Sequence, residues 1–254
     1  MRPWSGVGEA YAASYAVLCA GTIDALAAEL GSAAGRSILD VGSGTGLLAA
    51  RFEAWGWDVT GCEPEATMRA VAGREHPEVL FVDGALPDLP FDRAEFDAVT
   101  ANFVLNHVED PRRSARELAR VSADRVAATI WLRSPSWLWR EVCERAGLMP
   151  AAGERLASEK DFERDAAGFA GMLRDGGWHD VVVSELTWTW RADPAALWAS
   201  AEVGVASAGA FYRALDESGR DRFRGSFDEL CAERAVDGVI ALAHTAAIAS
   251  GHSG

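Results

Sequence analysis

Positive charge and paired cysteines are scarce in this chain of 254 residues. Lysine occurs once, at Lys160, and the formal net charge is −14. Because phosphate backbones are bound mainly by lysine and arginine, this balance argues against a nucleic-acid partner. The four cysteines lie far apart and form no Cys-x-x-Cys pair, so the sequence indicates neither a zinc site nor a disulfide framework.

Long apolar runs are also missing. No segment approaches about 18 uninterrupted apolar residues, so no membrane span is expected. The N-terminal stretch contains Glu9 and lacks the pattern of a secretory signal. We therefore expect a cytoplasmic protein with no membrane partner. A hydrophobic content of 49% is ample for the packed core of one α/β domain.

The most informative stretch joins a short apolar run to three glycines. Residues 37–41 suit one buried strand, and Gly42, Gly44 and Gly46 follow before a helical pattern begins at Leu47. Such a layout presents helix N-terminal amides to a ligand. A dinucleotide-binding fingerprint needs its third glycine at the position that Leu47 occupies, so that class is disfavoured.

An acidic residue follows the second expected strand, 58–62. Glu63 lies 23 residues after Asp40. A carboxylate at the tip of the second strand can accept hydrogen bonds from both hydroxyls of a ribose. The alternative is an acidic residue at a helix N-terminus, where the helix dipole favours it.

Five further strand patterns alternate with helical ones. They lie at 79–82, 96–101, 126–131, 181–190 and 239–248. This alternation predicts an α/β protein whose ligand crevice lies at the carboxyl ends of the strands.

Four segments together resemble the class I S-adenosylmethionine-dependent methyltransferases. Residues 40–46 match the Asp-x-Gly-x-Gly-x-Gly motif, 63–68 an acidic-Pro-x-x-x-Met pattern, 83–91 the segment that ends in Leu-Pro-Phe, and 96–111 the fourth motif. The resemblance is specific between residues 38 and 110. Within the class, the chain is similar to small-molecule enzymes of the ubiquinone/menaquinone-biosynthesis type and to bacterial natural-product tailoring enzymes.

This resemblance implies a Rossmann-like, doubly wound sheet of seven strands, the last antiparallel, with helical cap and lid elements. We expect a single methyltransferase domain over 1–254. Its expected parts are N-terminal helices at 1–34, a cofactor-binding half at 35–132, a lid segment at 133–167, and a C-terminal half at 168–254 with a cap insertion at 192–235.

The resemblance also implies S-adenosyl-L-methionine as cofactor, S-adenosyl-L-homocysteine as product, and no metal. The expected cofactor-binding residues are Tyr11, Asp40, Gly42, Ser43, Gly44, Gly46, Glu63, Pro64, Met68, Gly84, Ala85, Leu86, Asn102 and Phe103. Met68 is equally a core position by its helical spacing. Ala85 stands where the family often has an aspartate, so either Asp83 or the backbone of 84–86 holds the adenine amine.

Aromatic residues on segments expected to border the acceptor pocket are Tyr15, Trp131, Trp137, Trp139, Trp198 and Phe211. Aromatic walls suit a flat or apolar acceptor and favour a cationic sulfonium. Packing in the core is the alternative for at least half of the ten tryptophans. His107 is the candidate general base, with hydrogen bonding to a neighbouring loop as its alternative role.

The leading hypothesis is methyl transfer to an oxygen, nitrogen or carbon atom of a small apolar or aromatic metabolite in a biosynthetic pathway. Two alternatives are an enzyme that binds the same cofactor but catalyses a non-methylating step, and a non-catalytic ligand-binding protein. We expect a small-molecule substrate as partner, and a monomer or homodimer.

Overall fold

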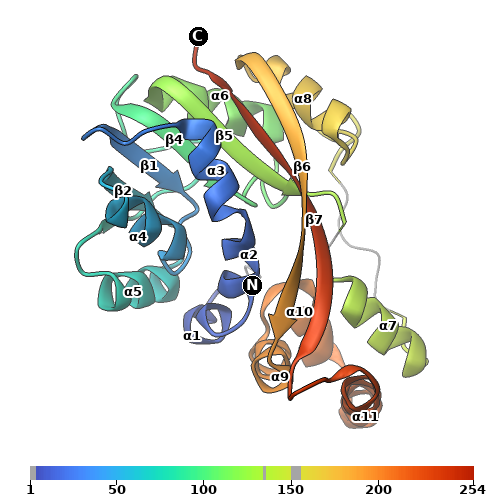
Figure 1. The fold of residues 1–254 in the computed structure, drawn as a ribbon. Helices are drawn as coiled ribbons and strands as arrows, with labels where there is room; N and C mark the ends of the chain where they lie inside the picture. The colour runs from blue at the N-terminus through green and yellow to red at the C-terminus, as the bar shows by residue number, and fades with distance from the viewer. Residues whose placement is uncertain (1–3, 134–135, 150–155) are drawn as a thin grey trace.

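A seven-stranded sheet forms the centre of the protein (Figure 1). The structure is a computed structural model that describes residues 4–133, 136–149 and 156–254. The strand order is β3-β2-β1-β4-β5-β7-β6, with β7 antiparallel to both neighbours and the other pairings parallel. The strands are β1 (Ser37–Val41), β2 (Asp58–Cys62), β3 (Leu80–Val82), β4 (Phe96–Asn102), β5 (Ser122–Trp131), β6 (His179–Ala192) and β7 (Ile240–His252). The expected doubly wound sheet is confirmed.

The sequence predicts the ends of β1 and β2 correctly and those of the later strands less well. Residues 122–125, which precede the expected strand 126–131, are the start of β5, because Ser122 and Arg125 pair with β4. The N-terminal helices, expected within 1–34, are α1 (Gly8–Ala12), α2 (Tyr15–Cys19), the 3-10 turn η1 (Ala20–Thr22) and α3 (Ile23–Leu30).

Helices cover both faces of the sheet because neighbouring strand residues point to opposite sides. In β1, Ile38 packs in a core with α3 and α4 (Leu47–Ala54), whereas Leu39 packs in a core with α6 (Pro111–Val121) and α8 (Ala166–Asp175). Both side chains are fully buried. The glycine loop therefore leaves a strand that is fixed from both sides.

Aspartates begin several helices. Asp110 accepts a hydrogen bond from the Arg113 amide at 3.0 Å and is followed by Pro111, an arrangement that favours a helix start. Comparable caps begin α8, α9 (Pro194–Val203) and α11 (Glu217–Arg234). These N-terminal hydrogen bonds fix where the four helices begin relative to the strands.

The last two strands extend beyond the sheet as a long two-stranded arm (Figure 1). β6 has 14 residues and β7 has 13, whereas β1 has 5. The helices α9, α10 (Ala206–Ala214) and α11 join the strands at the end of this arm, and α7 (Trp137–Arg145) packs against α11. The expected helical cap is thus present beside the carboxyl ends of β4 and β5.

Within the described ranges no helix is long and apolar enough to cross a membrane. The same residues contain no cluster of histidine, cysteine and carboxylate side chains with the geometry of a metal site.

Candidate functional site

The turn after β1 requires glycine at two positions, for reasons of both backbone conformation and packing. Gly42 and Gly46 have positive φ angles of 69° and 84°. A Cβ on Gly42 would lie 2.5 Å from Val104 Cγ2, and one on Gly46 would lie 2.6 Å from Phe81 Cζ. No side chain fits at these distances, so the two glycines allow neighbouring elements to close around the turn.

Gly44 differs from these two glycines. The side on which other residues carry a Cβ faces the ring of Tyr11, in α1. A Cβ on Gly44 would lie 3.3 Å from Tyr11 Cε1. The Gly44 amide donates to Glu63 Oε2 at 3.0 Å, and the Glu65 amide donates to Glu63 Oε1 at 2.9 Å. The glycine loop and the acidic residue after β2, predicted separately from the sequence, therefore meet directly.

Two buried carboxylates lie together at this point. Asp40, at the end of β1, is 1% exposed, and its Oδ2 has no hydrogen-bond partner among the residues that the structure describes. Burial, reinforced by the charge of Glu63, raises the pKa of Asp40 well above its usual value. Burial also raises the pKa of Glu63, against the opposing effect of its two amide bonds. The pair favours a ligand that brings hydroxyl donors or positive charge.

A hollow of about 30 Å³ adjoins the glycine loop. Its lining comes from the N-terminal helices, β1, the loop and the end of β4: Tyr11, Ala16, Cys19, Ala20, Ile23, Asp40, Gly42, Ser43, Thr45, Leu47, Leu48 and Asn102. Ser43 is buried and its hydroxyl has no partner in the described part of the chain. A space of this size holds about one water molecule. It is small because the Tyr11 ring lies against the glycine loop.

Asn102 ties the N-terminal helices to the sheet. Its Oδ1 accepts hydrogen bonds from Thr22 Oγ1 at 2.9 Å and Thr129 Oγ1 at 2.6 Å. Its Nδ2 donates to the carbonyl oxygen of Cys19 at 3.2 Å. The Asn102 side chain is thus engaged by protein groups, and its expected contact with the cofactor stays a prediction.

Phe103 follows with a positive φ of 59°, an unusual conformation for a bulky residue. Its amide donates to Thr129 Oγ1 at 2.8 Å. Its ring is stacked on that of Trp131, with centroids 3.7 Å apart and 7° between the planes. This geometry turns the Phe103 ring away from the glycine loop and toward β5.

The remaining expected cofactor residues lie on the adjacent edge of the sheet. Met68 is buried in α5 (Ala66–Glu75), whereas Pro64 and Ala85 are exposed, and Gly84 and Leu86 are half-buried. In the same region, Asp83 forms an exposed ion pair with Arg69 at 3.1 Å. That contact directs the Asp83 carboxylate toward α5, and all five binding assignments stay predictions.

His107 lies outside the hollow, on the loop that follows β4. The residue is exposed overall, although its ring meets Trp4 edge-on, with centroids 5.2 Å apart. Such packing removes water from part of the ring, and this desolvation lowers the pKa of His107 below its usual value. Trp4 also meets Tyr11 edge-on at 5.9 Å, so the N-terminal segment joins His107 to the hollow. Its role as a base stays a prediction.

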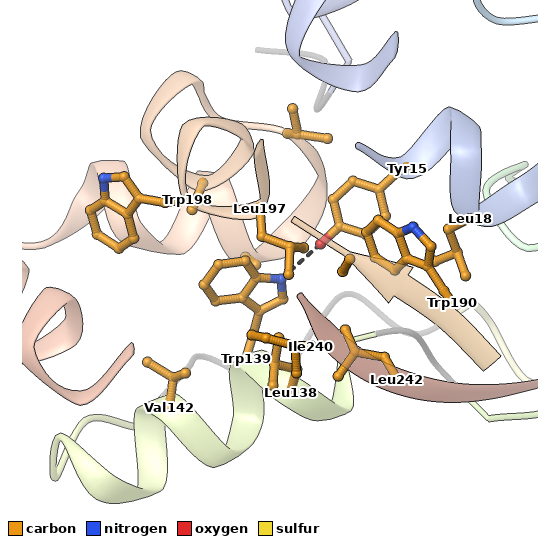
Figure 2. Packing of buried hydrophobic residues seen from close by; sticks show 14 of the residues in the cluster. Tyr15, Leu18, Leu138, Trp139, Val142, Trp190, Leu197, Trp198, Ile240 and Leu242 are labelled. Atoms are coloured by element: carbon orange, nitrogen blue, oxygen red, sulfur yellow. Dashed lines mark hydrogen bonds between the residues drawn. The ribbon is translucent and has the colours of Figure 1, made fainter. Parts of the chain in front are cut away.

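The aromatic residues predicted for the acceptor pocket fall into two groups. Trp139, Trp198 and Phe211 pack in the cap against Phe223, and the first two also contact Phe227. Figure 2 shows Trp139 and Trp198 among the buried residues of the cap, and the hydrogen bond from Trp139 Nε1 to the Tyr15 hydroxyl, 2.7 Å long, that joins the cap to α2. Burial raises the pKa of Tyr15 to about 12. For this group the structure favours packing, the alternative that the sequence left open.

Trp131 and Trp137 instead belong to a cluster around His244, with three residues that the sequence analysis did not single out. These are Trp188 and Trp190 of β6 and His244 of β7. The sequence did contain a signal for the two tryptophans, because Trp188 and Trp190 are two apart in an expected strand and therefore share a face. The position of His244 beside them depends on strand register, which the sequence does not reveal.

The strand order, the glycine loop and the acidic tip of β2 define a nucleoside-binding α/β protein. A family model described as a methyltransferase domain matches residues 39–125. Similar curated proteins include the demethylmenaquinone methyltransferases of Paenarthrobacter aurescens, 30% identical over 60% of this chain and 66% of that protein, and of Streptomyces griseus, 28% identical over 64% of this chain and 77% of that protein.

Solved structures share the fold at lower identity. The YcgJ protein from Bacillus subtilis has a TM-score of 0.59 at 17% identity, over 91% of this chain and 97% of that chain. A putative methyltransferase from an antibiotic biosynthesis pathway of Anabaena variabilis has a TM-score of 0.58 at 18% identity, over 89% and 95%. The chain belongs to the class I S-adenosylmethionine-dependent methyltransferases, as the sequence motifs predicted.

Proposed function

We propose that this protein transfers the methyl group of S-adenosylmethionine to an oxygen, nitrogen or carbon atom of a small, apolar or aromatic metabolite. The observation that carries the proposal is the direct hydrogen bond between the Gly44 amide and Glu63, beside the buried Asp40. A biosynthetic role is supported by the similarity to demethylmenaquinone methyltransferases, and natural-product tailoring remains part of the proposal.

The donor set fits the cofactor in its chemistry. Glu63 would accept hydrogen bonds from the ribose hydroxyls, and the unpartnered Oδ2 of Asp40 suits the amino-acid end with its ammonium group. Met68 and the backbone of 84–86 would border the adenine. When bound, S-adenosylmethionine supplies a methyl group that is already activated by a positive sulfur. The chain then has to align donor and acceptor and exclude water.

Binding requires the N-terminal segment to move, because Tyr11 lies against Gly44 and only about 30 Å³ remains free. Two of the side-chain contacts that hold this segment to α5 are exposed, namely the ion pair between Glu9 and Arg74 at 2.7 Å and the bond from the Gly6 amide to Glu65 at 3.3 Å. Exposed pairs of this kind contribute about 0–1 kcal/mol each. The cost of opening therefore comes mainly from Val7, which is buried in one cluster with Met68, and from the partly buried bond of the Gly8 amide to Thr67 Oγ1 at 3.3 Å.

Titration calorimetry with S-adenosylhomocysteine and S-adenosylmethionine tests the cofactor site. Glu63→Gln keeps the size of the side chain but removes the charged acceptor, so we expect an affinity at least about tenfold lower than that of the wild type. Glu53→Gln, in α4, is the matched control, because Glu53 lies outside the hollow. Equal affinities of the Glu63 variant and the wild type would contradict the proposal.

Turnover separates the two alternative functions. The protein is incubated with S-adenosylmethionine and hydroxylated aromatic compounds, and formation of S-adenosylhomocysteine is followed together with methylated product. Appearance of both supports the methyltransferase. Tight cofactor binding without either product would favour a non-methylating enzyme, and absence of cofactor binding would favour a protein that binds a different ligand.

A further inference from the structure

Four tryptophans surround one histidine beside the carboxyl ends of β5 and β6. The ring centroid of His244 lies 5.7 Å from that of Trp131, 6.5 Å from Trp137, 6.1 Å from Trp188 and 6.2 Å from Trp190. We call these five residues the His244 box. His244 is 1% exposed, whereas Trp137 and Trp188 are only half-buried. The box therefore has a buried polar centre and two walls that reach the surface.

Strand register builds the box. His244 of β7 lies directly opposite Trp188 of β6, and Ala246 of β7 lies opposite Trp131 of β5. Because residues two apart in a strand share a face, His244, Ala246 and both indoles point to the same side of the sheet. The small Ala246 side chain lets the rings of Trp131 and His244 meet edge-on, with centroids 5.7 Å apart.

The polar atoms of the box are unsatisfied. Neither ring nitrogen of His244 has a hydrogen-bond partner within the described ranges, and the same holds for Nε1 of Trp137 and Nε1 of Trp188. Buried polar groups are nearly always paired, so a cluster of four unpaired nitrogens indicates groups that a ligand satisfies. Burial and the positive charge of Arg133 lower the pKa of His244 to about 4, so the imidazole is neutral at physiological pH.

The box adjoins the cofactor crevice on two sides. Trp131 is stacked on Phe103, whose neighbour Asn102 lines the hollow beside the glycine loop. The Trp188 indole lies against η1, where a Cβ on Gly21 would come within 2.2 Å of Trp188 Nε1. A ligand in the box would thus lie next to the end of the crevice where methyl transfer has to occur.

The hydrogen-bonding capacity of the box points to a chemical class. A neutral imidazole offers one donor and one acceptor, and each indole offers one donor. A ligand that satisfies them needs oxygen acceptors and one hydroxyl donor, on a ring flat enough to lie among indoles. A cationic amine is disfavoured, because the Arg133 guanidinium lies 4.9 Å from the centroid of Trp137.

We propose that the His244 box is the acceptor site, that it takes a neutral planar aromatic compound carrying a hydroxyl group, and that His244 hydrogen-bonds this hydroxyl. The inference rests on the proposed function for its chemical step. The acceptor oxygen forms a bond to the methyl carbon as the carbon–sulfur bond breaks, and the electron pair of that bond stays on sulfur. The hydroxyl proton leaves by way of His244 to water, because a buried imidazole with a pKa of about 4 beside Arg133 does not retain it at neutral pH.

Binding of 2-naphthol and naphthalene, followed by quenching of tryptophan fluorescence, tests the site. Wild type should bind 2-naphthol about tenfold more tightly than naphthalene, because only naphthol satisfies the imidazole. His244→Phe keeps the ring but removes both nitrogens, and should reduce this ratio to about one. His252→Phe is the control, with the same substitution at the other end of β7 in a residue paired with Asp124.

Titrations are run with and without S-adenosylhomocysteine, so the acceptor site and the cofactor site are measured separately. Loss of the ratio in His244→Phe, with retained affinity for S-adenosylhomocysteine, supports the proposal. An unchanged ratio in a folded His244→Phe, or in His244→Leu if the phenylalanine variant does not fold, overturns it. A wild type that binds 2-naphthol selectively but does not bind S-adenosylhomocysteine would contradict the proposed methyltransferase function. The His244 box would then be a binding site without that chemistry.

Discussion

The hydroxyl of Thr129 is shared between two functional segments: it donates to Asn102 Oδ1 at 2.6 Å and accepts from the Phe103 amide at 2.8 Å. One side chain of β5 thereby sets both the end of β4 and the unusual backbone of Phe103. The cofactor crevice and the His244 box meet at this point.

Thr129→Val should destabilise the protein by about 1–3 kcal/mol, because the Phe103 amide loses its partner in a buried position. The measurement is urea unfolding. Thr100→Val is a matched control in β4, since Thr100 is equally buried and its hydroxyl has no partner within the described residues. The control should be neutral or slightly stabilising. A larger loss in Thr100→Val than in Thr129→Val would refute this account of the junction.

Gly44→Val should abolish detectable cofactor binding without unfolding the protein. Its Cβ enters the space between the loop and Tyr11, and its backbone requires a φ of 56° that valine adopts poorly. Calorimetry with S-adenosylhomocysteine and circular dichroism report the two effects. Gly73→Ala, on an open face of α5, should keep cofactor affinity and gain about 0.5–1 kcal/mol of stability. Affinity of the Gly44 variant within about threefold of wild type counts against the assigned site.

Cofactor binding should release protons in mildly acidic solution. The raised pKa values of Asp40 and Glu63 mean that both stay protonated to higher pH than usual in the free protein, whereas hydroxyl donors and positive charge favour their ionised forms. Affinity should therefore rise with pH until both groups are ionised. Calorimetry at about pH 6 in buffers of different ionisation enthalpy measures the release. The release should be smaller in Asp40→Asn, and identical enthalpies for wild type in all buffers would contradict the prediction.

His244 should make the protein less stable in acid. Its pKa is about 4 in the folded state and 6.5 without burial, so the unfolded chain takes up a proton first as the pH falls. The stability associated with neutral His244 is fully present above pH 6.5 and is lost progressively toward pH 4, by roughly 1–3 kcal/mol in total.

The comparison of wild type with His244→Phe isolates this effect, because Asp40 and Glu63 titrate in both proteins. The variant should also be more stable by about 1–2 kcal/mol at neutral pH, since two unpaired nitrogens are removed. Denaturant unfolding at several pH values gives the difference. Parallel stability curves for the two proteins would show that His244 does not titrate in this way.

The cofactor half of the site could be predicted from the sequence because its parts are local. The glycine spacing after Asp40 and the position of Glu63 follow from a strand, a turn and a helix that are contiguous in the chain. Family motifs supplied the other residues proposed for that half, and these assignments stay predictions. Gly44 and Glu63 were predicted separately, and in the structure they are in direct contact.

The acceptor half could not be predicted, since its geometry depends on contacts between distant segments. Trp139 and Trp198 were expected at the pocket, but helices of the cap enclose them with Phe223 and Phe227. His244 gave no local signal, because only its pairing with Trp188 across the β6–β7 ladder places it among indoles. Register over such separations is not encoded in any short motif.

The ladder between β6 and β7 runs without a break from Val182 to Ala192, where it reaches the cap helices. A domain attached through a flexible linker could swing aside to admit a substrate, but hinge motion here would break consecutive backbone hydrogen bonds. We therefore expect the cap helices to keep their position relative to the sheet. Substrate exchange has to proceed on the opposite flank, past the short helices that precede β1.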